Sequence, residues 1–473
     1  MHVGIIGGGI SGLATAYYLL KEGCQVTIFE AGSRLGGLAT STQVQGVWID
    51  KFYHCILPSD TALLSLIEDL GLGREVYWTE TEMGFLFRQR LYSLTTPMDL
   101  LRFSALSLTD RLRLGMTALY TRSLNDWRKL EQVTAEEWLV RFCGKRAFDT
   151  VWKPLLTFKF GDNYNEVPAS WLWGRVKRQA TTRQGRSQKE ALAYVRGGFK
   201  VIFERLAEEI LRLGGIIHTD TKVEGIKIAG DKASGIFVRG NLHPFDKVVS
   251  TLPITQFLKL VDPASLGNSF EYTTMSYQGV VCVLLVLKEK LSPYYWMPVV
   301  DSGASFAGIV ETTNLIRRED LGGINLVYLV NYVPREDPLF SATEGELIEQ
   351  SLPMLGNLFP HFNPSQVLEA HVHRAAFVEP RWALNYSSHM PRRILLNNSL
   401  FLLTTAQLYP EINSTSNCVK QVKEVFDQLI TQPLPDLSGA QSLPQAVSLP
   451  RQQETEWAVQ CTPYAQSITE PRR

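Results

Sequence analysis

The sequence predicts an α/β fold in which a domain with a parallel sheet is interleaved with an α+β domain that contains a mixed sheet and helices. A strand, a glycine-rich turn, a helix and a second strand follow one another within residues 2–30. Segments of the same style return near residues 193–252 and 399–429, whereas the sequence between them has other patterns. The chain has 473 residues, more than one hydrophobic core usually serves. We therefore expect two interleaved domains.

Glycine turns join the expected elements of the parallel domain. Its elements are the strand 2–6, the helix 13–21, the strand 25–30, the helix 200–213, the strand 246–252, the strand 399–404 and the helix 416–429. The α+β domain has its own set, namely helices at 61–70, 100–120, 134–142 and 344–355 and strands at 280–287, 307–311 and 325–333. The apolar run 279–287 is too short to cross a bilayer and indicates a buried strand.

These elements divide the chain into six segments. The parallel domain takes residues 1–75, 191–255 and 396–430, and the α+β domain takes residues 76–190 and 256–395. Residues 431–473 are rich in Pro, Gln and Ser without periodicity, so we expect a disordered tail.

Charge and cysteine content narrow the class of protein. Forty-seven basic residues balance forty-seven acidic ones, so we expect no nucleic-acid partner. The six cysteines are scattered without metal-ligand spacing, which predicts free thiols, no metal site and a reducing, cytoplasmic location. The first strand begins almost at once, so no secretory signal is expected. Nothing in the composition predicts an oligomeric state.

The turn between the first strand and helix reads Gly7-Gly8-Gly9-Ile10-Ser11-Gly12, a GxGxxG pattern. Gly7 permits the tight turn, Gly9 lets the backbone approach a pyrophosphate, and Gly12 lets the helix pack on the strand. Ser11 lies at the helix start, whose amides face an anion. Glu30 ends the next strand, where an acidic side chain binds ribose hydroxyls and repels a 2′-phosphate. A bare connecting turn is the alternative, but strand, helix and Glu30 together favour a dinucleotide site.

Residues just after Glu30 favour FAD over NAD. Arg34 is followed by Gly36 and Gly37, and a basic side chain with two more glycines suits a cofactor whose second half continues along the protein. The predicted parallel domain is therefore a Rossmann-type FAD-binding domain.

The stretch GIIGGGISGLATAYYLLKEGCQVTIFEAGSRLGG resembles the FAD-binding start of the amine oxidase, protoporphyrinogen oxidase and phytoene desaturase superfamily. The resemblance continues at YVRGGF (194–199), TKVEGI (221–226) and DKVVSTLP (246–253). WKPLL (152–156) together with KFG (159–161) resembles a segment of the family's substrate domain. It implies that Val223 offers its backbone to the adenine. The C-terminal flavin segment departs from the family pattern at 403–417, which leaves Asn417, with Ser416, as the expected helix-start contact.

His54 is the candidate for a polar active-site group, because it follows the second glycine pair at a position that should fall near the flavin ring. The competing interpretation, which we favour for a histidine without a visible partner, is a satisfied loop or core residue. His371 and His373 alternate on an expected strand, which puts them on one face. No further ligands accompany them, so a structural role is predicted.

Two segments bear on partners. Residues 98–120 place Leu, Phe and Met at helical spacing among arginines, and core packing is favoured over peripheral membrane contact or a substrate tunnel. Six basic residues between 175 and 189 have no acidic residue among them, and a solvated loop is favoured over binding of an anionic substrate or lipid headgroup. The six are Arg175, Lys177, Arg178, Arg183, Arg186 and Lys189.

The resemblance implies an FAD-dependent oxidoreductase that removes a hydride from a C–N or C–C bond of a largely apolar small molecule. The segment IDKFYHCI (49–56) also resembles the UDP-galactopyranose mutase group, so a flavin-dependent nucleotide-sugar mutase is one alternative. A flavin-binding protein without turnover is another. The substrate and the electron acceptor do not follow from these residues.

Overall fold

The computed structural model describes residues 1–88, 90–182, 189–269, 275–299 and 305–431. The predicted tail lies outside the described residues from position 432 onward.

A six-stranded sheet forms the first layer, in the strand order β19-β20-β13-β1-β2-β9. Its pairs are parallel except for β19 with β20. The strands are β1 (His2–Ile6), β2 (Gln25–Phe29), β9 (Ile216–His218), β13 (Lys247–Ser250), β19 (Ile394–Leu395) and β20 (Leu400–Leu402). Strands distant in sequence thus share one parallel sheet, as expected for a Rossmann-type domain.

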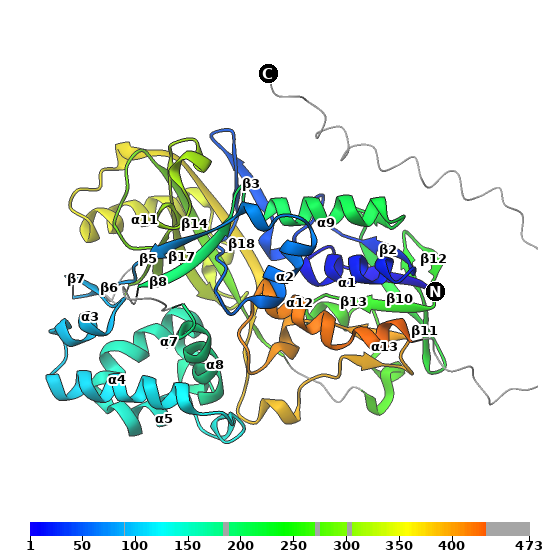
Figure 1. Ribbon diagram of the computed structural model, residues 1–473, viewed down its shortest axis with the longest axis horizontal. Coiled ribbons are helices and arrows are strands. Elements are labelled where there is room, and N and C mark those ends of the chain that lie inside the picture. Colours follow the sequence, from blue (N-terminus) through cyan, green and yellow to red (C-terminus); the bar gives the residue numbers. More distant parts are fainter. Residues whose placement is uncertain (89, 183–188, 270–274, 300–304, 432–473) are drawn as a thin grey trace, which may run out of the picture.

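Three helices lie side by side along this sheet, where Figure 1 shows α1 between α9 and α12. They are α1 (Ile10–Lys21), α9 (Lys200–Arg212) and α12 (Thr415–Glu424). The antiparallel strands β10 (Val223–Ala229), β11 (Lys232–Val238) and β12 (Asn241–Pro244) contact β13 through β11. The sheet is therefore covered by helices and by a small second sheet, which explains why Val3 and Ile5 of β1 and Val248 and Val249 of β13 are fully buried.

A five-stranded sheet builds the second layer, in the order β15-β16-β17-β14-β18. Its strands are β14 (Tyr277–Leu287), β15 (Trp296–Pro298), β16 (Gly308–Glu311), β17 (Asn325–Val333) and β18 (Val367–Pro380). We expected a mixed sheet, but every pairing within it is antiparallel. The central β14 is buried along its whole length, as its apolar run predicts, and α11 (Glu344–Leu358) packs on it.

The chain between these layers forms a helical region, seen in cyan to green at the lower left of Figure 1. It contains α3 (Pro97–Arg102), α4 (Leu108–Ser123), α5 (Ala135–Cys143), α6 (Lys145–Ala147), α7 (Lys153–Phe160) and α8 (Ala169–Gln179). The start of α3 is fixed by a Thr96–Asp99 capping box and that of α5 by a Thr134–Glu137 box. Helix α4 packs against α5 and α8.

Two predictions for this region are wrong. We expected a loop from residue 175 onward, but residues 175–179 form the end of α8. This segment is helical because Trp171 and Leu172 bury one face of an amphipathic helix. Arg183 and Arg186 lie outside the described residues. Core packing of residues 98–120 fails on the outer face of α4, where Leu108, Leu112 and Met116 are at least half exposed.

Short elements complete the described chain. They are β3 (Ser41–Val44), β4 (Val47–Asp50), α2 (Thr61–Asp69), β5 (Val76–Thr81), β6 (Gly84–Phe87), β7 (Arg90–Ser93), β8 (Glu190–Val195), α10 (Ile254–Phe257) and α13 (Phe426–Ile430).

Candidate cofactor and substrate site

A cavity of about 1110 Å³ extends from the first glycine turn into the space between the two sheets and the helical region. Its walls come from every layer of the fold. The lining residues fall within 7–11, 30, 36–39, 52–57, 82–83, 94–100, 114–122, 151–159, 175–180, 190–192, 251–253, 280–282, 295–296, 330–332, 375–379, 404–405 and 412–418. The cavity thus joins the glycine-turn end of the parallel sheet to a chamber walled by the five-stranded sheet and the helical region.

The glycine turn lies at one end of this cavity. Gly7 has φ of +105°, a conformation that favours glycine, and a Cβ on Gly12 would lie 2.0 Å from the Gly7 carbonyl oxygen. The bare backbone of Gly9 faces open space, because a Cβ there would meet nothing nearer than the Gly37 Cα, 3.9 Å away. Gly9 is the N-cap of α1, so the first amides of that helix have no side-chain cap.

The acidic residue and the second glycine pair close around the turn. The two Glu30 carboxylate oxygens accept hydrogen bonds from the backbone N–H groups of Gly8 and Gly32, at 2.7 Å each. The Gly36 N–H donates to the Gly8 carbonyl oxygen at 2.9 Å. Glu30, Gly36 and Gly37 all line the cavity.

Four of the predicted cofactor residues do not line the cavity, namely Gly12, Arg34, Val223 and Asn417. Gly12 packs α1 against the turn, and Arg34 lies over the Trp48 ring, 4.3 Å from its centroid. Val223 is buried at the start of β10. The Asn417 side chain donates to the Ile412 carbonyl oxygen at 2.8 Å, so it holds the chain before α12.

The divergent C-terminal segment nevertheless reaches the cavity. Thr404 and Thr405 line it, as do Asn413, Ser414 and Thr415, which lie immediately before and at the start of α12. The Ser414 hydroxyl accepts from the Asn417 N–H at 3.1 Å and thereby caps the helix. Residues 413–415 thus bring the start of α12 to the cavity, whereas the Asn417 side chain is bonded to the Ile412 carbonyl oxygen and does not line it.

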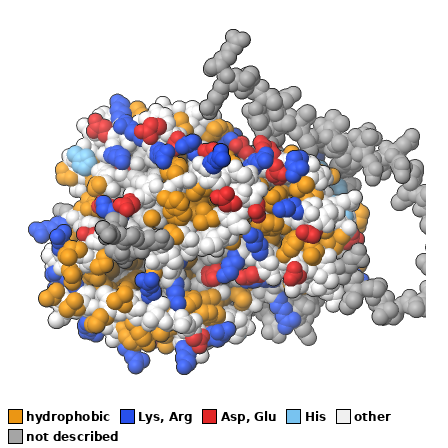
Figure 2. Space-filling view, viewed as in Figure 1, with side chains coloured by type: hydrophobic (Ala, Val, Ile, Leu, Met, Phe, Trp, Pro, Cys, Tyr) orange, Lys and Arg blue, Asp and Glu red, His pale blue; other side chains and the backbone are white. Residues whose placement is uncertain are grey.

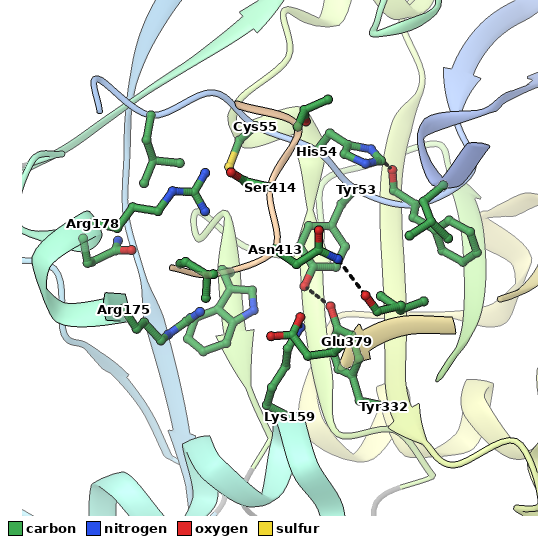
Figure 3. Close-up of a pocket in the computed structure, with 18 of the residues that line it drawn as sticks. Tyr53, His54, Cys55, Lys159, Arg175, Arg178, Tyr332, Glu379, Asn413 and Ser414 are labelled. Atoms are coloured by element: carbon green, nitrogen blue, oxygen red, sulfur yellow. Dashed lines mark hydrogen bonds and ion pairs between the residues drawn. The ribbon is translucent and has the colours of Figure 1, made fainter. Parts of the chain in front are cut away.

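His54 lines the middle of the cavity, where Figure 3 shows it beside Tyr53 and Cys55. Its Nδ1 lies 2.8 Å from the Phe52 carbonyl oxygen. Burial lowers the pKa of His54 to about 4, so the ring is neutral near pH 7. A neutral ring that donates from Nδ1 has Nε2 as an acceptor. His54 can therefore accept a hydrogen bond but is a weak base.

Beyond His54, two ion pairs occupy the inner end of the cavity. The Lys159 Nζ lies 3.2 Å from the Glu379 carboxylate and 3.9 Å from the centre of the Tyr332 ring. The Tyr332 hydroxyl hydrogen-bonds the Tyr53 hydroxyl at 2.9 Å.

The second ion pair joins α8 to the start of α2. The Arg178 guanidinium donates to both Asp60 carboxylate oxygens, at 2.9 and 3.0 Å. Figure 3 shows Arg175 and Arg178 extending from one helix toward the interior of the pocket. Both arginines belong to the basic run of the sequence, and no sequence pattern places them here, because only the packing of α8 turns them inward.

The remaining residue expectations concern metals and membranes. In the part of the chain that the structure describes, no cluster of three or more His, Cys, Asp or Glu residues could hold a metal ion. The His371 and His373 rings are stacked with centroids 6.4 Å apart, which confirms that they share a face. Among the described helices, none is long and apolar enough to cross a bilayer.

Comparison with known proteins gives the family. The model of the family described as flavin containing amine oxidoreductase matches residues 10–393. The chain belongs to this family. The predicted resemblance is confirmed, and with it the FAD cofactor and the oxidoreductase class.

Curated relatives match only parts of their length. Protoporphyrinogen oxidase 2 of Arabidopsis thaliana is 28% identical over 144 residues, which cover 30% of this chain and 28% of that protein. Coproporphyrinogen III oxidase of Staphylococcus aureus is 24% identical over 325 residues, which cover 61% of this chain and 68% of that protein.

Solved structures agree in fold. An oxidoreductase from Methanosarcina mazei has a TM-score of 0.70 at 19% identity, covering 90% of this chain and 100% of that one. Reduced UDP-galactopyranose mutase has a TM-score of 0.68 at 15% identity, covering 91% of this chain and 96% of that one. At these identities the likeness shows the fold alone. The predicted α/β fold is thereby confirmed.

The residues at the glycine end fit FAD. The bare backbone at Gly9, the uncapped start of α1 and the carboxylate of Glu30 are the groups that a pyrophosphate and a ribose require. A second helix start, at Ser414 and Thr415, faces the same cavity. When bound, FAD supplies a hydride acceptor.

Proposed function

We propose that this flavoprotein removes a hydride from a C–C or C–N bond of a largely apolar small molecule held in the inner half of the cavity. The observation that carries this proposal is the continuity of one cavity from the Rossmann-type glycine turn to a chamber walled by the second sheet and the helical region. The names of the relatives, oxidases of protoporphyrinogen and coproporphyrinogen, agree with carbon oxidation.

The chamber walls favour an apolar substrate. Hydrophobic side chains from α3, α4, α7, β17 and β18 line it, namely Leu100, Leu114, Ala118, Leu155, Val330, Phe377 and Val378. Such walls exclude water and orient the substrate, while the flavin does the chemistry. In this proposal His54 is the polar group near the reacting atoms, where its neutral ring accepts a hydrogen bond and does not compete for a proton.

We also propose that the cofactor is held by Gly7, Gly9, Ser11, Glu30, Gly36 and Gly37, with Arg34 and Val223 at the adenosine end and Gly12 fixing the turn. Residues 413–415 replace Asn417 as the C-terminal contact in this assignment. We likewise propose a division into two domains, one made of residues 1–75, 191–255 and 396–430 and the other of residues 76–190 and 256–395. It is supported by the parallel sheet, whose strands all come from the first set except β19, at 394–395.

Anaerobic reduction of the purified holoprotein tests the proposal. We expect a yellow protein that releases FAD on denaturation and whose flavin absorbance is bleached by a substrate in a library of apolar compounds with oxidisable C–C and C–N bonds. Rearrangement of a nucleotide sugar only after chemical reduction of the flavin would instead establish the mutase. Bound flavin that no compound bleaches would favour a protein without turnover.

We further propose that α3 and α4 attach the protein to the surface of an anionic lipid bilayer. On α4, Leu108, Leu112, Met116 and Leu119 are 50% to 67% exposed and recur at helical spacing. Figure 2 shows hydrophobic side chains gathered over this region at the lower left, with Lys and Arg around them. Apolar side chains bordered by basic ones match a bilayer with acidic headgroups.

The lining of the cavity reaches the same surface. Leu119 is 67% exposed and also lines the cavity, and exposed Pro97 on α3 lines it as well. The other face of α4, at Leu114 and Ala118, forms the inner wall. An apolar substrate dissolved in the bilayer would therefore enter the chamber without crossing water.

Co-sedimentation with vesicles tests the attachment. We expect binding to vesicles of phosphatidylcholine with phosphatidylserine, weaker binding to phosphatidylcholine alone, and loss of binding in the double variant Leu112→Glu, Met116→Glu. Leu242→Glu, a change at a leucine 46% exposed on β12, is the matched control and should bind as the wild type does. Equal loss in both variants, or no binding by the wild type, would contradict the attachment.

A further inference from the structure

Arg175 is a cation of the inner cavity without an anionic partner in the described part of the chain. The neighbouring cations are neutralised, since Lys159 pairs with Glu379 at 3.2 Å and Arg178 with Asp60 at 2.9 Å. No carboxylate within 4.0 Å and no hydrogen-bond acceptor is found for the Arg175 guanidinium among the described residues. Its contacts are instead the Trp171 and Trp296 rings, with centroids 5.8 and 5.9 Å away.

The position of Arg175 makes this lack of a partner significant. The side chain is partly buried on α8 and lines both the main cavity and an adjoining chamber of about 50 Å³, whose other walls include Tyr53 and Tyr332. A guanidinium carries five N–H donors and stays charged in proteins. Partial burial of such a group is unfavourable unless an anion or acceptors face it. The two indole rings restrict the side chain, so the fork is held ready for an incoming group.

We propose that Arg175 binds a carboxylate carried by an otherwise apolar substrate. The proposal rests on the function proposed above and narrows its substrate class. One unpaired positive charge matches a monoanion, and the planar guanidinium matches a carboxylate with two parallel hydrogen bonds. The same charge repels a cationic amine, which favours oxidation at carbon over oxidation of an alkylammonium.

The charge count also bears on nucleotide sugars. A diphosphate bears two or more negative charges, whereas the described residues at the inner end of the cavity offer one cation that is not already paired. Binding of a nucleoside diphosphate would require the Lys159 or the Arg178 ion pair to open, leaving Glu379 or Asp60 buried without its partner. The monoanion is therefore the better match.

Octanoate, 1-octanol and octylammonium serve as probes, because they share a chain and differ in charge. Binding to the holoprotein is followed by perturbation of the flavin spectrum and by tryptophan fluorescence, since Trp171 and Trp296 flank Arg175. We expect octanoate to bind about 10-fold or more tightly than octanol, the range for a charge-assisted hydrogen bond, and octylammonium to bind most weakly.

Three variants test whether Arg175 is the residue that gives the preference for octanoate over octanol. Arg175→Gln should abolish the preference for octanoate over octanol, and Arg175→Lys should retain part of it because the charge remains while the fork is lost. Arg122 also lines the cavity, at the exposed end of α4, and has no ion pair among the described residues. Arg122→Gln should therefore retain the full preference. A preference that disappears in Arg122→Gln and persists in Arg175→Gln would overturn the assignment.

Further outcomes separate this inference from the proposed function. Equal binding of octanoate and octanol by a yellow, reducible protein would overturn the carboxylate site alone. A protein that holds no FAD would contradict the proposed function. The carboxylate site could still be tested in that protein, because tryptophan fluorescence reports octanoate binding without the flavin. Tighter binding of uridine diphosphate than of octanoate, with competition between them, would overturn the inference in favour of a diphosphate ligand. FAD content, measured after denaturation, confirms that each variant is folded.

Discussion

Gly9 contributes to the proposed nucleotide site through its backbone alone, because it has no side chain. A Cβ at this position would project into the cavity without meeting the protein, so Gly9→Ala should fold and yet obstruct the pyrophosphate. We expect FAD affinity to fall by about 10-fold to 100-fold with little change in the stability of the apoprotein, measured by flavin fluorescence titration and thermal unfolding.

Gly345→Ala is the control for this change. Gly345 lies in α11, where an added Cβ also meets open space, away from the cavity. Alanine there should leave FAD affinity unchanged and stabilise the helix by up to about 1 kcal/mol. Equal FAD affinity in Gly9→Ala and the wild type would remove Gly9 from the proposed site.

His54 predicts a pH dependence of stability. Its folded pKa of about 4 lies below the ordinary value of 6.5, because burial disfavours the charged ring. As the pH falls below 6.5, the unfolded chain binds a proton that the native state refuses, so the free energy of unfolding decreases until about pH 4. The full effect is on the order of 3 kcal/mol.

The variant His54→Asn isolates the contribution of His54 to the pH dependence of the free energy of unfolding. Asparagine does not titrate, and His373, whose pKa burial also lowers to about 4, contributes equally to both proteins. The thermal midpoint of the wild type should therefore fall more between pH 7 and pH 5 than that of His54→Asn. Parallel decreases in the two proteins would show that His54 is not buried as a neutral ring.

At the scale of elements, α12 combines a structural cap with the cavity wall. Ser414 caps α12, and Thr343 caps α11 by accepting from the Glu346 N–H at 3.2 Å. Replacing either by Ala should cost about 1 kcal/mol of unfolding free energy. Only Ser414 lines the cavity, so only Ser414→Ala should weaken FAD binding as well. Denaturant titration and FAD titration of both variants check this, and equal FAD affinity would mean that the start of α12 does not hold the cofactor.

Helices α4 and α8 illustrate which element properties a linear pattern conveys. The sequence predicts one helix over residues 100–120, which the structure divides into α3 and α4, and it predicts a loop where α8 ends. The Ser107 hydroxyl caps the start of α4 by accepting from the Asp110 N–H. The side that each helix buries depends on its neighbours. Helix α4 packs on α5 and α8 and leaves its outer leucines exposed, while α8 buries Trp171 and directs Arg175 toward the cavity.

At the scale of the whole molecule, FAD should act as a link between the part that carries the parallel sheet and the part that carries the five-stranded sheet and the helical region. Because residues from both line one cavity, a ligand that fills it stabilises the native state by an amount that rises with its concentration, about 4 kcal/mol at 1,000 times the dissociation constant. We expect removal of FAD to lower the thermal midpoint by several degrees. FMN should restore less than FAD does, because it lacks the adenosine that Glu30 and the glycine turn would hold. Equal rescue by FMN and FAD would place the nucleotide elsewhere.

The sequence alone determined the family, the cofactor and the Rossmann-type sheet. A strand, a glycine turn, a helix and Glu30 act within 30 residues, and the conformation of such a unit depends on backbone sterics and local hydrogen bonds. It also located His54 on the path of the cavity, two residues from the carbonyl oxygen that orients its ring.

Only the tertiary structure decided how the chamber is built. Lys159 and Glu379 are 220 positions apart and Arg178 and Asp60 are 118 apart, so no local pattern predicts that each pair is satisfied while Arg175 is not. The same packing puts Ser414 on the cavity lining and Asn417 off it, and it leaves one face of α4 in solvent. Burial and charge pairing are properties of surfaces brought together by folding, whereas a glycine turn is a property of consecutive residues.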